Sequence, residues 1–258
     1  MKKVLLVYRH NEKMHYKGIT QFLTSKGISV SACERKVLNK SKTKGKDLVI
    51  TLGGDGTFLT TSHYLDSHTP IVAINANKKT TYGFYTRINM HNFKEKLSNI
   101  LKGSYKIKQL SRINVKVNGK QRIHDATNDV FFGNTRPHGT ARYILNFKNK
   151  KELQASSGVI ISTPQGTHGW MKSLGLKPLS IDDKKLLFII REPIRNDIYS
   201  PTIIKGTLLK DDCLNLVSAK PSLMIGIDGH IKDELKIKEN DRISICRSKQ
   251  KVLFIDKC

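Results

Sequence analysis

The feature that most constrains the fold is a strand, a glycine-rich turn and a helix in direct succession between residues 47 and 65. Residues 47–52 read D-L-V-I-T-L, a short β-branched run that predicts a buried parallel strand. Residues 57–65 have the length and the apolar spacing of a helix. The turn L-G-G-D-G-T between them therefore lies at the carboxyl end of a buried strand.

This turn has the composition of a phosphate site. Gly53, Gly54 and Gly56 allow a sharp turn and a close approach of anionic oxygens to the backbone amides. Thr57 is suited to cap a helix whose N-terminus attracts phosphate, and Asp55 is the side chain there able to accept a proton or hold a metal ion. The turn indicates phosphoryl transfer, and the alternative is a tight strand-to-helix turn with an Asx-type hydrogen bond.

The charge is strongly positive, because 46 Lys and Arg residues stand against 21 Asp and Glu residues, for a net charge of +25. Such a charge attracts polyanions. The lysines are spread along the chain, with dense runs only at 36–46 and 148–151, and no nucleic-acid-binding motif accompanies them. We therefore expect no nucleic-acid partner. A solvated surface, attraction of nucleotide phosphates and binding of an inorganic polyphosphate chain all remain compatible with the charge.

The sequence predicts a soluble, cytoplasmic protein without a membrane partner. No stretch approaches the roughly 18 to 20 apolar residues of a membrane span, and Met1 to Lys3 lead directly into an apolar strand-like run. The four cysteines stand singly, and the histidines show no metal-ligand spacing. We therefore expect reduced thiols and no structural zinc or other fixed protein metal site.

The chain divides into two parts of different periodicity. Up to residue 101, strand-like and helix-like segments alternate, which predicts a parallel sheet with helices on its faces. These segments are 4–8, 14–26, 28–32, 47–52, 57–65, 71–75 and 91–101, with an exposed loop at 36–46. After Gly103 short alternating runs follow, and Asn118-Gly119 is a strong hairpin signal. We predict an α/β domain at 1–103 and a mostly β domain at 104–258, with the chain end able to return to the first domain.

A second glycine turn follows the strand-like run 158–162. Gly166 and Gly169 permit close backbone approach, and Thr163 and Thr167 supply hydroxyl groups. Trp170 either packs against a flat base or anchors the helix that continues through residues 171–174.

Between the two turns, Asn128 and Asp129 interrupt a β-forming run. Their side chains suit hydrogen bonds to an adenine edge or to ribose hydroxyls, but such pairs also shape turns. His168, in the second turn, is either a phosphate or ribose donor or a filler.

Taken in order, L-G-G-D-G-T-F-L at 52–59, N-D-V at 128–130, S-T-P-Q-G-T at 162–167 and I-D-G at 227–229 resemble the NAD kinase family. The resemblance covers most of the chain. Ser157, where many bacterial members have Asp, and Gly169-Trp170, where they have Ala-Tyr, resemble the mitochondrial-type branch. The loop 74–85 matches a family loop ending in G-F, but here Lys78 and Lys79 enter it, as phosphate ligands or as part of a solvated face.

The resemblance implies a Rossmann-like α/β domain, an all-β C-terminal domain and a nucleotide cleft between them. It further implies transfer of the γ-phosphate of ATP to the 2′-hydroxyl of the adenosine ribose of NAD, with Mg²⁺ or another divalent cation accompanying ATP. Asp55 matches the catalytic aspartate, which accepts the proton of that hydroxyl. The positions matching phosphate- or nucleotide-binding residues are Gly53, Gly54, Gly56, Thr57, Asn128, Asp129, Thr163, Gly166, Thr167, His168, Gly169, Trp170 and Ser173.

The resemblance also implies small-molecule nucleotide partners and a homodimer or homotetramer. Two other functions are compatible with parts of the pattern. One is a lipid or sphingoid kinase with a similar G-G-D-G turn, although no amphipathic membrane-binding segment is evident. The other is a non-catalytic protein that binds NADP(H) or RNA. The intact Asp55 argues against the NADP(H)-binding alternative.

Overall fold

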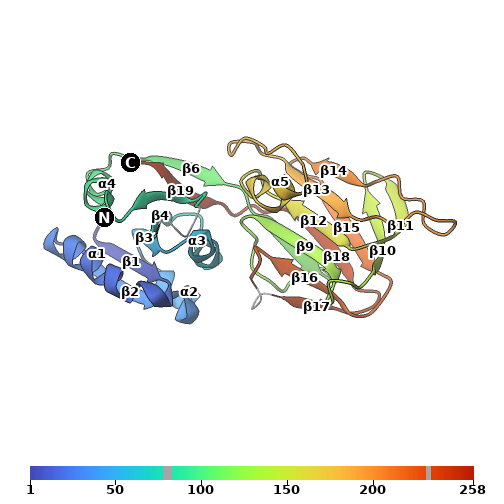
Figure 1. Cartoon of the computed structure of the whole chain (residues 1–258), viewed down its shortest axis with the longest axis horizontal. Helices are drawn as coiled ribbons and strands as arrows, with labels where there is room; N and C mark the ends of the chain where they lie inside the picture. Colours follow the sequence, from blue (N-terminus) through green and yellow to red (C-terminus); the bar gives the residue numbers. More distant parts are fainter. Residues whose placement is uncertain (78–82, 231–233) are drawn as a thin grey trace. The chain divides into compact units, whose positions relative to one another are not determined.

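The computed structural model describes residues 1–77, 83–230 and 234–258, and these residues form two compact units. Unit 1 contains Met1–Leu110 and Lys251–Cys258, and unit 2 contains Ser111–Gln250 (Figure 1). The α/β part followed by an all-β part confirms the expected fold class. No helix among the described residues has both the length and the apolarity that crossing a bilayer requires.

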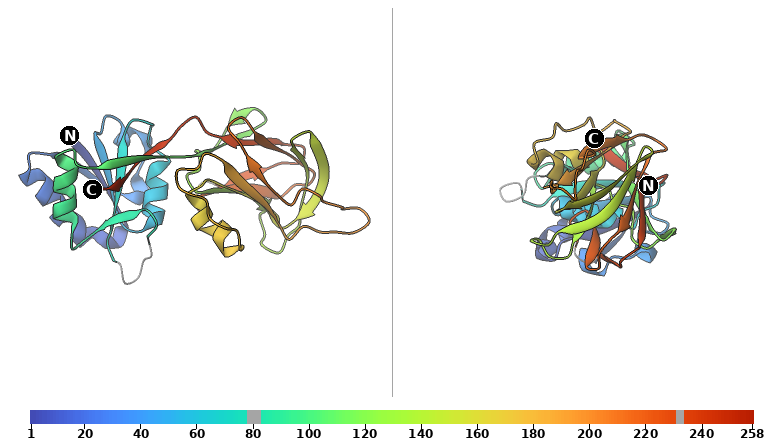
Figure 2. Two further views of the ribbon diagram at one scale, coloured as in Figure 1. Left: turned by 90° about the horizontal axis from the view of Figure 1, so that it is seen from above. Right: turned by 90° about the vertical axis from the view of Figure 1, so that its right-hand side faces the viewer.

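Unit 1 is built on one sheet. Its strands are β1 (Lys3–Tyr8), β2 (Ser29–Glu34), β3 (Leu48–Leu52), β4 (Pro70–Asn75), β5 (Thr86–Asn89), β6 (Lys106–Leu110) and β19 (Val252–Lys257). The order is β2-β1-β3-β4-β19-β6, with β5 also paired to β4. The pairs among β1 to β4 are parallel, so these strands end at the same edge. The last strand, β19, lies between β4 and β6, as Figure 2 also shows.

The helices of unit 1 cover both faces of this sheet. They are α1 (Lys13–Ser25), α2 (Lys40–Thr43), α3 (Asp55–Ser62) and α4 (Phe93–Leu101), with 3₁₀ turns η1 (His10–Glu12) and η2 (Arg35–Val37). The strands alternate their side chains between the two faces. Val4 and Leu6 pack with Leu23 of α1 and Leu97 of α4, whereas Phe58 of α3 packs against Phe254 from β19 on the other face.

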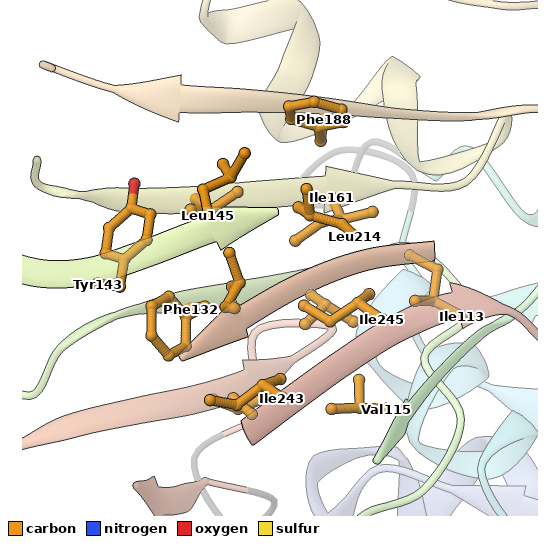
Figure 3. Packing of buried hydrophobic residues seen from close by; sticks show 14 of the residues in the cluster. Ile113, Val115, Phe132, Tyr143, Leu145, Ile161, Phe188, Leu214, Ile243 and Ile245 are labelled. Atoms are coloured by element: carbon orange, nitrogen blue, oxygen red, sulfur yellow. The ribbon is translucent and has the colours of Figure 1, made fainter. Parts of the chain in front are cut away.

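Unit 2 is an antiparallel sandwich of two six-stranded sheets. One sheet contains β7 (Ile113–Val117), β8 (Lys120–Gln121), β10 (Ala141–Phe147), β11 (Lys150–Ser156), β15 (Cys213–Ser218) and β18 (Arg242–Arg247). The other contains β9 (Asp129–Asn134), β12 (Gly158–Ser162), β13 (Leu186–Arg191), β14 (Lys205–Leu208), β16 (Leu223–Ile227) and β17 (Leu235–Ile237). Their inward side chains, among them Phe132, Tyr143 and Ile245, form one buried cluster (Figure 3). The turn η3 (Gly166–His168) and helix α5 (Trp170–Ser173) follow β12.

Two sequence-based expectations about local structure are wrong. Residues 36–46 are not a continuous loop, because η2 and α2 form there and the Asn39 side chain accepts a hydrogen bond from the Lys42 amide. The thiols are not all reduced, because Cys213 and Cys246 form a disulfide. Antiparallel pairing of β15 with β18 places these two residues directly opposite each other, which their separation of 33 residues in the sequence does not reveal.

Candidate nucleotide-binding and phosphoryl-transfer site

The first glycine turn connects β3 to α3 and has the backbone geometry that its composition predicts. Gly53 has a φ of 150°, and a Cβ on it would lie 2.6 Å from Thr57 Oγ1, so only glycine fits without strain. Helix α3 begins at Asp55, with Gly54 as its N-cap and no capping side chain. The expectation that Thr57 caps this helix is therefore wrong, because Thr57 already lies inside the first turn. The amides of the first turn are the donors that a helix N-terminus presents to an anion.

Two backbone amides from the residues just before β5 hold the Asp55 carboxylate. Phe84 N–H donates to Oδ2 at 2.7 Å, and Tyr85 N–H donates to Oδ1 at 2.9 Å. Burial raises the pKa of Asp55 above its ordinary value, while the two amides and the charge of Arg87 act in the opposite direction. Asp55 is thus a fixed, partly buried carboxylate whose proton affinity is raised, as a general base requires.

Two arginines that the sequence analysis did not single out lie beside this turn. Arg9 follows β1 and Arg35 follows β2, and these strands end at the same edge as β3, which leads into the turn. The Arg9 amide donates to Leu52 O at 3.1 Å. Arg35 Nη1 lies 3.5 Å from the position of a Cβ on Gly56, and Arg9 Cβ lies 3.5 Å from that of a Cβ on Gly53.

The two guanidinium groups carry like charges, and the charge of the Glu34 carboxylate partly offsets the effect of Arg9 on Arg35. Burial is the main cause that lowers the pKa of Arg35, and the charge of Arg9 adds to it. Within the described part of the chain, neither guanidinium forms an ion pair, since the nearby Glu34 carboxylate bonds His10 Nδ1 at 2.9 Å. The two arginines lie 26 positions apart in the sequence. Only the parallel pairing of β1 with β2 and β3 shows that they follow strands ending at the same edge.

In unit 2 the Asn128-Asp129 segment is held by the carboxylate of Asp228. The amides of Thr127, Asn128 and Asp129 all donate to it, at 2.8, 2.6 and 3.0 Å. Asp228 follows β16 and has a φ of 51°, a conformation that Asp tolerates better than most residues. Asp228 of the I-D-G motif therefore holds the backbone of the N-D motif in place. The spacing of the two motifs in the sequence does not show this contact.

The second glycine turn packs against the same segment. Thr163 Oγ1 donates to Thr127 O at 2.7 Å, and Gln165 Nε2 donates to the same oxygen at 2.7 Å. A Cβ on Gly166 would lie 2.1 Å from Asn128 O, so glycine is required by the close approach of two backbone segments. Gln165, which the sequence analysis overlooked, fixes the turn from the buried side.

The remaining predicted residues of this turn divide into buried and exposed members. Thr167 Oγ1 accepts the Leu179 amide at 2.9 Å, and His168 Nε2 bonds Leu179 O at 2.9 Å, so both hold the segment after α5. Because a carbonyl oxygen only accepts, His168 Nε2 carries the proton in that bond. Gly169 and Ser173 are exposed.

Trp170 is half-buried, and its ring centroid lies 5.6 Å from that of Phe131. The Arg191 guanidinium lies 5.6 Å from the same Trp170 ring. This packing favours the anchoring interpretation of Trp170 and leaves part of the ring accessible.

Asp129 is the most strongly perturbed carboxyl of the predicted set. Burial, followed by the charge of Asp228, raises its pKa to about 7. No hydrogen bond from another described residue reaches its carboxyl oxygens. This group can therefore donate a hydrogen bond in its neutral form and accept hydroxyl donors in its charged form.

The structure thus brings the predicted residues together in two sets. Gly53, Gly54, Asp55, Gly56 and Thr57 form one turn in unit 1, and all the others lie in unit 2, around the contact between the N-D segment and the second turn. Lys78 and Lys79, for which phosphate contact and a solvated loop face were the alternatives, lie outside the described residues.

Comparison with known proteins matches the same regions. The ATP-NAD kinase N-terminal domain matches residues 5–105. The chain is 30% identical to an NAD kinase of Methanocorpusculum labreanum over 220 residues, which cover 84% of this chain and 76% of that protein. It is 27% identical to an NAD kinase of Fusobacterium nucleatum over 262 residues, 99% of this chain and 93% of that protein. It is 31% identical to a probable NADH kinase of rice over 169 residues, which span 52% of the rice protein.

Two solved structures share the fold. A crystal structure of an NAD kinase from Archaeoglobus fulgidus in complex with ATP aligns with a TM-score of 0.80 at 18% identity, over 99% of this chain and 94% of that chain. A crystal structure of yeast NADH kinase complexed with NADH aligns with a TM-score of 0.81 at 15% identity, over 100% and 84%.

Proposed function

This chain belongs to the NAD kinase family, and we propose that it makes NADP by transferring the γ-phosphoryl group of ATP to the 2′-hydroxyl of the adenosine ribose of NAD. The observation that carries the proposal is Asp55, a carboxylate of raised pKa on a glycine turn at the N-terminus of α3. The lipid-kinase and non-catalytic alternatives have no comparable support, since the relatives are NAD kinases along most of their length.

We propose that Asp55 accepts the proton of the ribose hydroxyl while its oxygen attacks the γ-phosphorus. An oxygen–phosphorus bond forms, the bond from the γ-phosphorus to the β-phosphate oxygen breaks, and ADP leaves. Two amide hydrogen bonds hold the Asp55 carboxylate, which fixes the direction of the basic oxygen. Positioning and charge stabilisation supply most of the acceleration in phosphoryl transfer.

The phosphates of the donor would contact Gly53, Gly54, Gly56 and Thr57 through the amides of the turn. We add Arg9 and Arg35 to this set, because both follow strands that end at the same edge of the sheet and lie beside the turn. An anion between two like charges removes their repulsion, and guanidinium groups bind phosphate in two-pronged geometry.

For NAD we propose Asn128 and Asp129 as the polar ligands, with Thr163, Gly166, Thr167, His168, Gly169, Trp170 and Ser173 lining the same region. The exposed edge of the second turn and the accessible part of Trp170 support this assignment. Thr167 and His168 act at least partly through the backbone of Leu179.

We propose that Mg²⁺ enters with ATP. Within the described ranges, no three His, Cys, Asp or Glu side chains are grouped as a metal site. The ligands that fit are the phosphate oxygens of ATP, which are of the kind that Mg²⁺ prefers. The ion would neutralise charge on the transferring phosphate.

Four further proposals are finer than the family assignment, and they concern the branch of the family, the oligomeric state, the domain bounds and the cellular location. Ser157, Gly169-Trp170 and the similarity to the rice protein support the mitochondrial-type branch. Exposed apolar side chains of unit 2, such as Ile198 and Leu209, support a homodimer or homotetramer, which light scattering tests. The domain bounds 1–103 and 104–258 stay a proposal, which limited proteolysis tests. The contact units, Met1–Leu110 with Lys251–Cys258 and Ser111–Gln250, support two domains and the return of the chain end to the first.

The intracellular production of ATP and NAD supports a cytoplasmic location. Disulfides are rare in reducing compartments. Thiol labelling of the freshly isolated protein therefore tests this location, and a Cys213–Cys246 bridge already present in the cell would oppose it.

The decisive test is NADP formation from NAD, ATP and Mg²⁺, measured with an NADP-specific dehydrogenase. We expect activity in the wild type and a loss of about 10²- to 10⁴-fold in Asp55→Asn and Asp55→Ala, with unchanged circular dichroism. Wild-type-like turnover in both variants would exclude the assigned base.

The same assay separates the other functions. Polyphosphate in place of ATP tests an alternative donor, and background activity with it removes that donor. A wild-type protein that folds but forms no NADP with any donor, and instead phosphorylates diacylglycerol or a long-chain base, would overturn the NAD kinase proposal.

A further inference from the structure

Both members of one ion pair in unit 1 occupy irregular positions of their strands. Strand β5 pairs with β4 so that Thr86 and Ile88 oppose the consecutive residues Ala73 and Ile74, which leaves Arg87 as the extra residue. In the same way Ile255 and Lys257 of β19 oppose Ile107 and Lys106 of β6, which leaves Asp256 as the extra residue. Such bulges turn a side chain away from the regular alternation and are frequent beside active sites.

The two bulges bring Arg87 and Asp256 together. Arg87 Nε donates to Asp256 Oδ1 at 2.8 Å, and the Asp256 side chain is only 12% exposed. The guanidinium lies 5.6 Å from the centroid of the Phe84 ring and 5.4 Å from that of the Phe254 ring. Contacts with two aromatic faces and one carboxylate fix the orientation of the guanidinium plane.

The same guanidinium acts on the peptide that holds Asp55. Arg87 Nη1 donates to Phe84 O at 2.6 Å. This carbonyl belongs to the peptide bond whose N–H, on Tyr85, donates to Asp55 Oδ1. A charged donor on the carbonyl polarises the amide and strengthens the hydrogen bond on its other side. The relay runs from Asp256 through Arg87 and one peptide unit to the catalytic carboxylate.

We propose that Arg87 and Asp256 are positioning residues of the phosphoryl-transfer site, which act on Asp55 through the peptide bond between Phe84 and Tyr85. The inference rests on the proposed role of Asp55 as the base. It gives the last strand of the chain a direct influence on the reaction, which neither residue type nor sequence position suggests.

The charged groups around Asp55 determine how each substitution should alter the pKa of this carboxyl. Arg87 approaches from β5 and lowers the pKa of Asp55, Asp256 stands behind Arg87 on β19, and Arg35 of η2 and Arg9 after β1 flank the turn. Removal of Arg87 should therefore raise the pKa of Asp55 further. Because the Asp256 side chain is only 12% exposed, Arg87→Gln leaves a largely buried carboxylate without its partner and should lower the free energy of unfolding. The double variant removes both charges and is the folded reference for this change.

The first experiment is the pH dependence of kcat in Arg87→Gln, Asp256→Asn and the double variant. Lys106→Gln, which removes a cation from the neighbouring exposed position of β6, is the matched control. In Arg87→Gln the acidic limb of the kcat–pH profile should move to higher pH than in Lys106→Gln, because the pKa of Asp55 rises. KM for ATP and NAD should change less than about twofold, because the change concerns the base and not ligand contacts.

The other variants separate charge from geometry. Asp256→Asn should shift the limb less than Arg87→Gln, and the double variant should match Arg87→Gln alone, because both act through one relay. Arg87→Lys keeps the charge without the planar fork, so its limb should stay near that of the wild type while kcat falls. A limb in Arg87→Gln that coincides with that of Lys106→Gln, whatever the value of kcat, would overturn the proposal.

A second measurement does not depend on turnover. The carboxyl ¹³C signal of Asp55, assigned by its absence in Asp55→Asn, is titrated in wild type, Arg87→Gln and Lys106→Gln. A higher pKa in Arg87→Gln alone supports the relay, and equal values in all three proteins exclude it. If the wild type forms no NADP, the proposed function fails, but this titration still decides whether Arg87 acts on Asp55.

Discussion

The two glycine turns of this protein are stabilised in different ways. The turn after β3 consists of backbone at a helix N-terminus, with Arg9, Arg35 and Arg87 disposed around it. The turn after β12 is held from inside the sandwich by neutral side chains, mainly Thr163 and Gln165, which bond to backbone carbonyls. The first turn is surrounded by positive charge, and the second is fixed by buried hydrogen bonds.

This difference fits two kinds of ligand contact. A triphosphate carries concentrated negative charge, and preorganised cations and backbone amides stabilise the charge that develops on it during transfer. A nucleoside is recognised by hydrogen bonds and flat contacts, which require rigid positions. The comparison predicts that charge changes act mainly on the first turn, whereas changes of buried volume or buried protonation act mainly on the second.

The largest expected effect is the response of stability to pH through Asp129. The pKa of Asp129 is about 7 in the folded protein against an ordinary value of 3.8. Below about pH 4 the carboxyl is protonated in the folded and in the unfolded protein, and its contribution to the free energy of unfolding is fully present. That contribution is lost as the pH rises through 7, because the folded protein holds the proton more tightly than the unfolded chain. At pH 8 the loss approaches about 4 kcal/mol. Asp129→Asn should abolish this slope, which urea unfolding at pH 5 and pH 8 measures. Parallel pH profiles for wild type and Asp129→Asn would refute it.

Gly166→Ala is expected to break the second turn. Its Cβ would lie 2.1 Å from Asn128 O, so backbone must move, at a cost of about 1–3 kcal/mol or more. The free energy of unfolding should fall by this amount and KM for NAD should rise, both measured beside Gly226→Ala. There the new methyl meets only the mobile end of Met224, at 3.4 Å. Equal behaviour of the two variants would show that the close approach at Gly166 does not matter.

Arg35→Gln is expected to weaken the first turn without touching the second. Loss of one charge-assisted contact should raise KM for ATP about tenfold, while KM for NAD and the unfolding free energy stay unchanged. Lys36→Gln, an exposed neighbour with the same loss of charge, is the control. If both variants raise KM for ATP equally, the effect is one of general charge and Arg35 has no special place.

His168→Ala should have the smallest effect. The lost bond from Nε2 to Leu179 O is exposed, so we expect at most about 1 kcal/mol in unfolding free energy and a change of less than threefold in turnover. His138→Ala, at another exposed position, controls for loss of an imidazole. A hundredfold loss of turnover in His168→Ala would assign it a direct contact with substrate instead.

Local patterns predicted the elements that their own residues determine. Apolar runs located strands β1, β3 and β4 of unit 1 and β12 of unit 2. The strand-turn-helix at 47–65 was found with the start of the helix placed two residues too late. Short strands with exposed, polar residues, such as β5 and β14, were missed, because they are defined by their partners and not by a hydrophobic pattern.

The candidate site was predictable only where its residues are adjacent in sequence. The glycine turns and the Asn128-Asp129 pair could be read directly. Asp228 as an acceptor for three amides, the disulfide and the Arg9–Arg35 pair depend on strand order and register, which a single sequence does not determine. The relay to Asp55 depends on two bulges, each of which is an exception to regular pairing.

The position of β19 also has a consequence for biosynthesis. Unit 1 needs this strand between β4 and β6, but a ribosome makes it after all of unit 2. Since domains fold as units during synthesis, unit 2 can complete its sandwich while the sheet of unit 1 still lacks an internal strand. The carboxylate at position 256 arrives with that strand. A nascent chain would therefore possess its second glycine turn well before the relay to Asp55 is assembled.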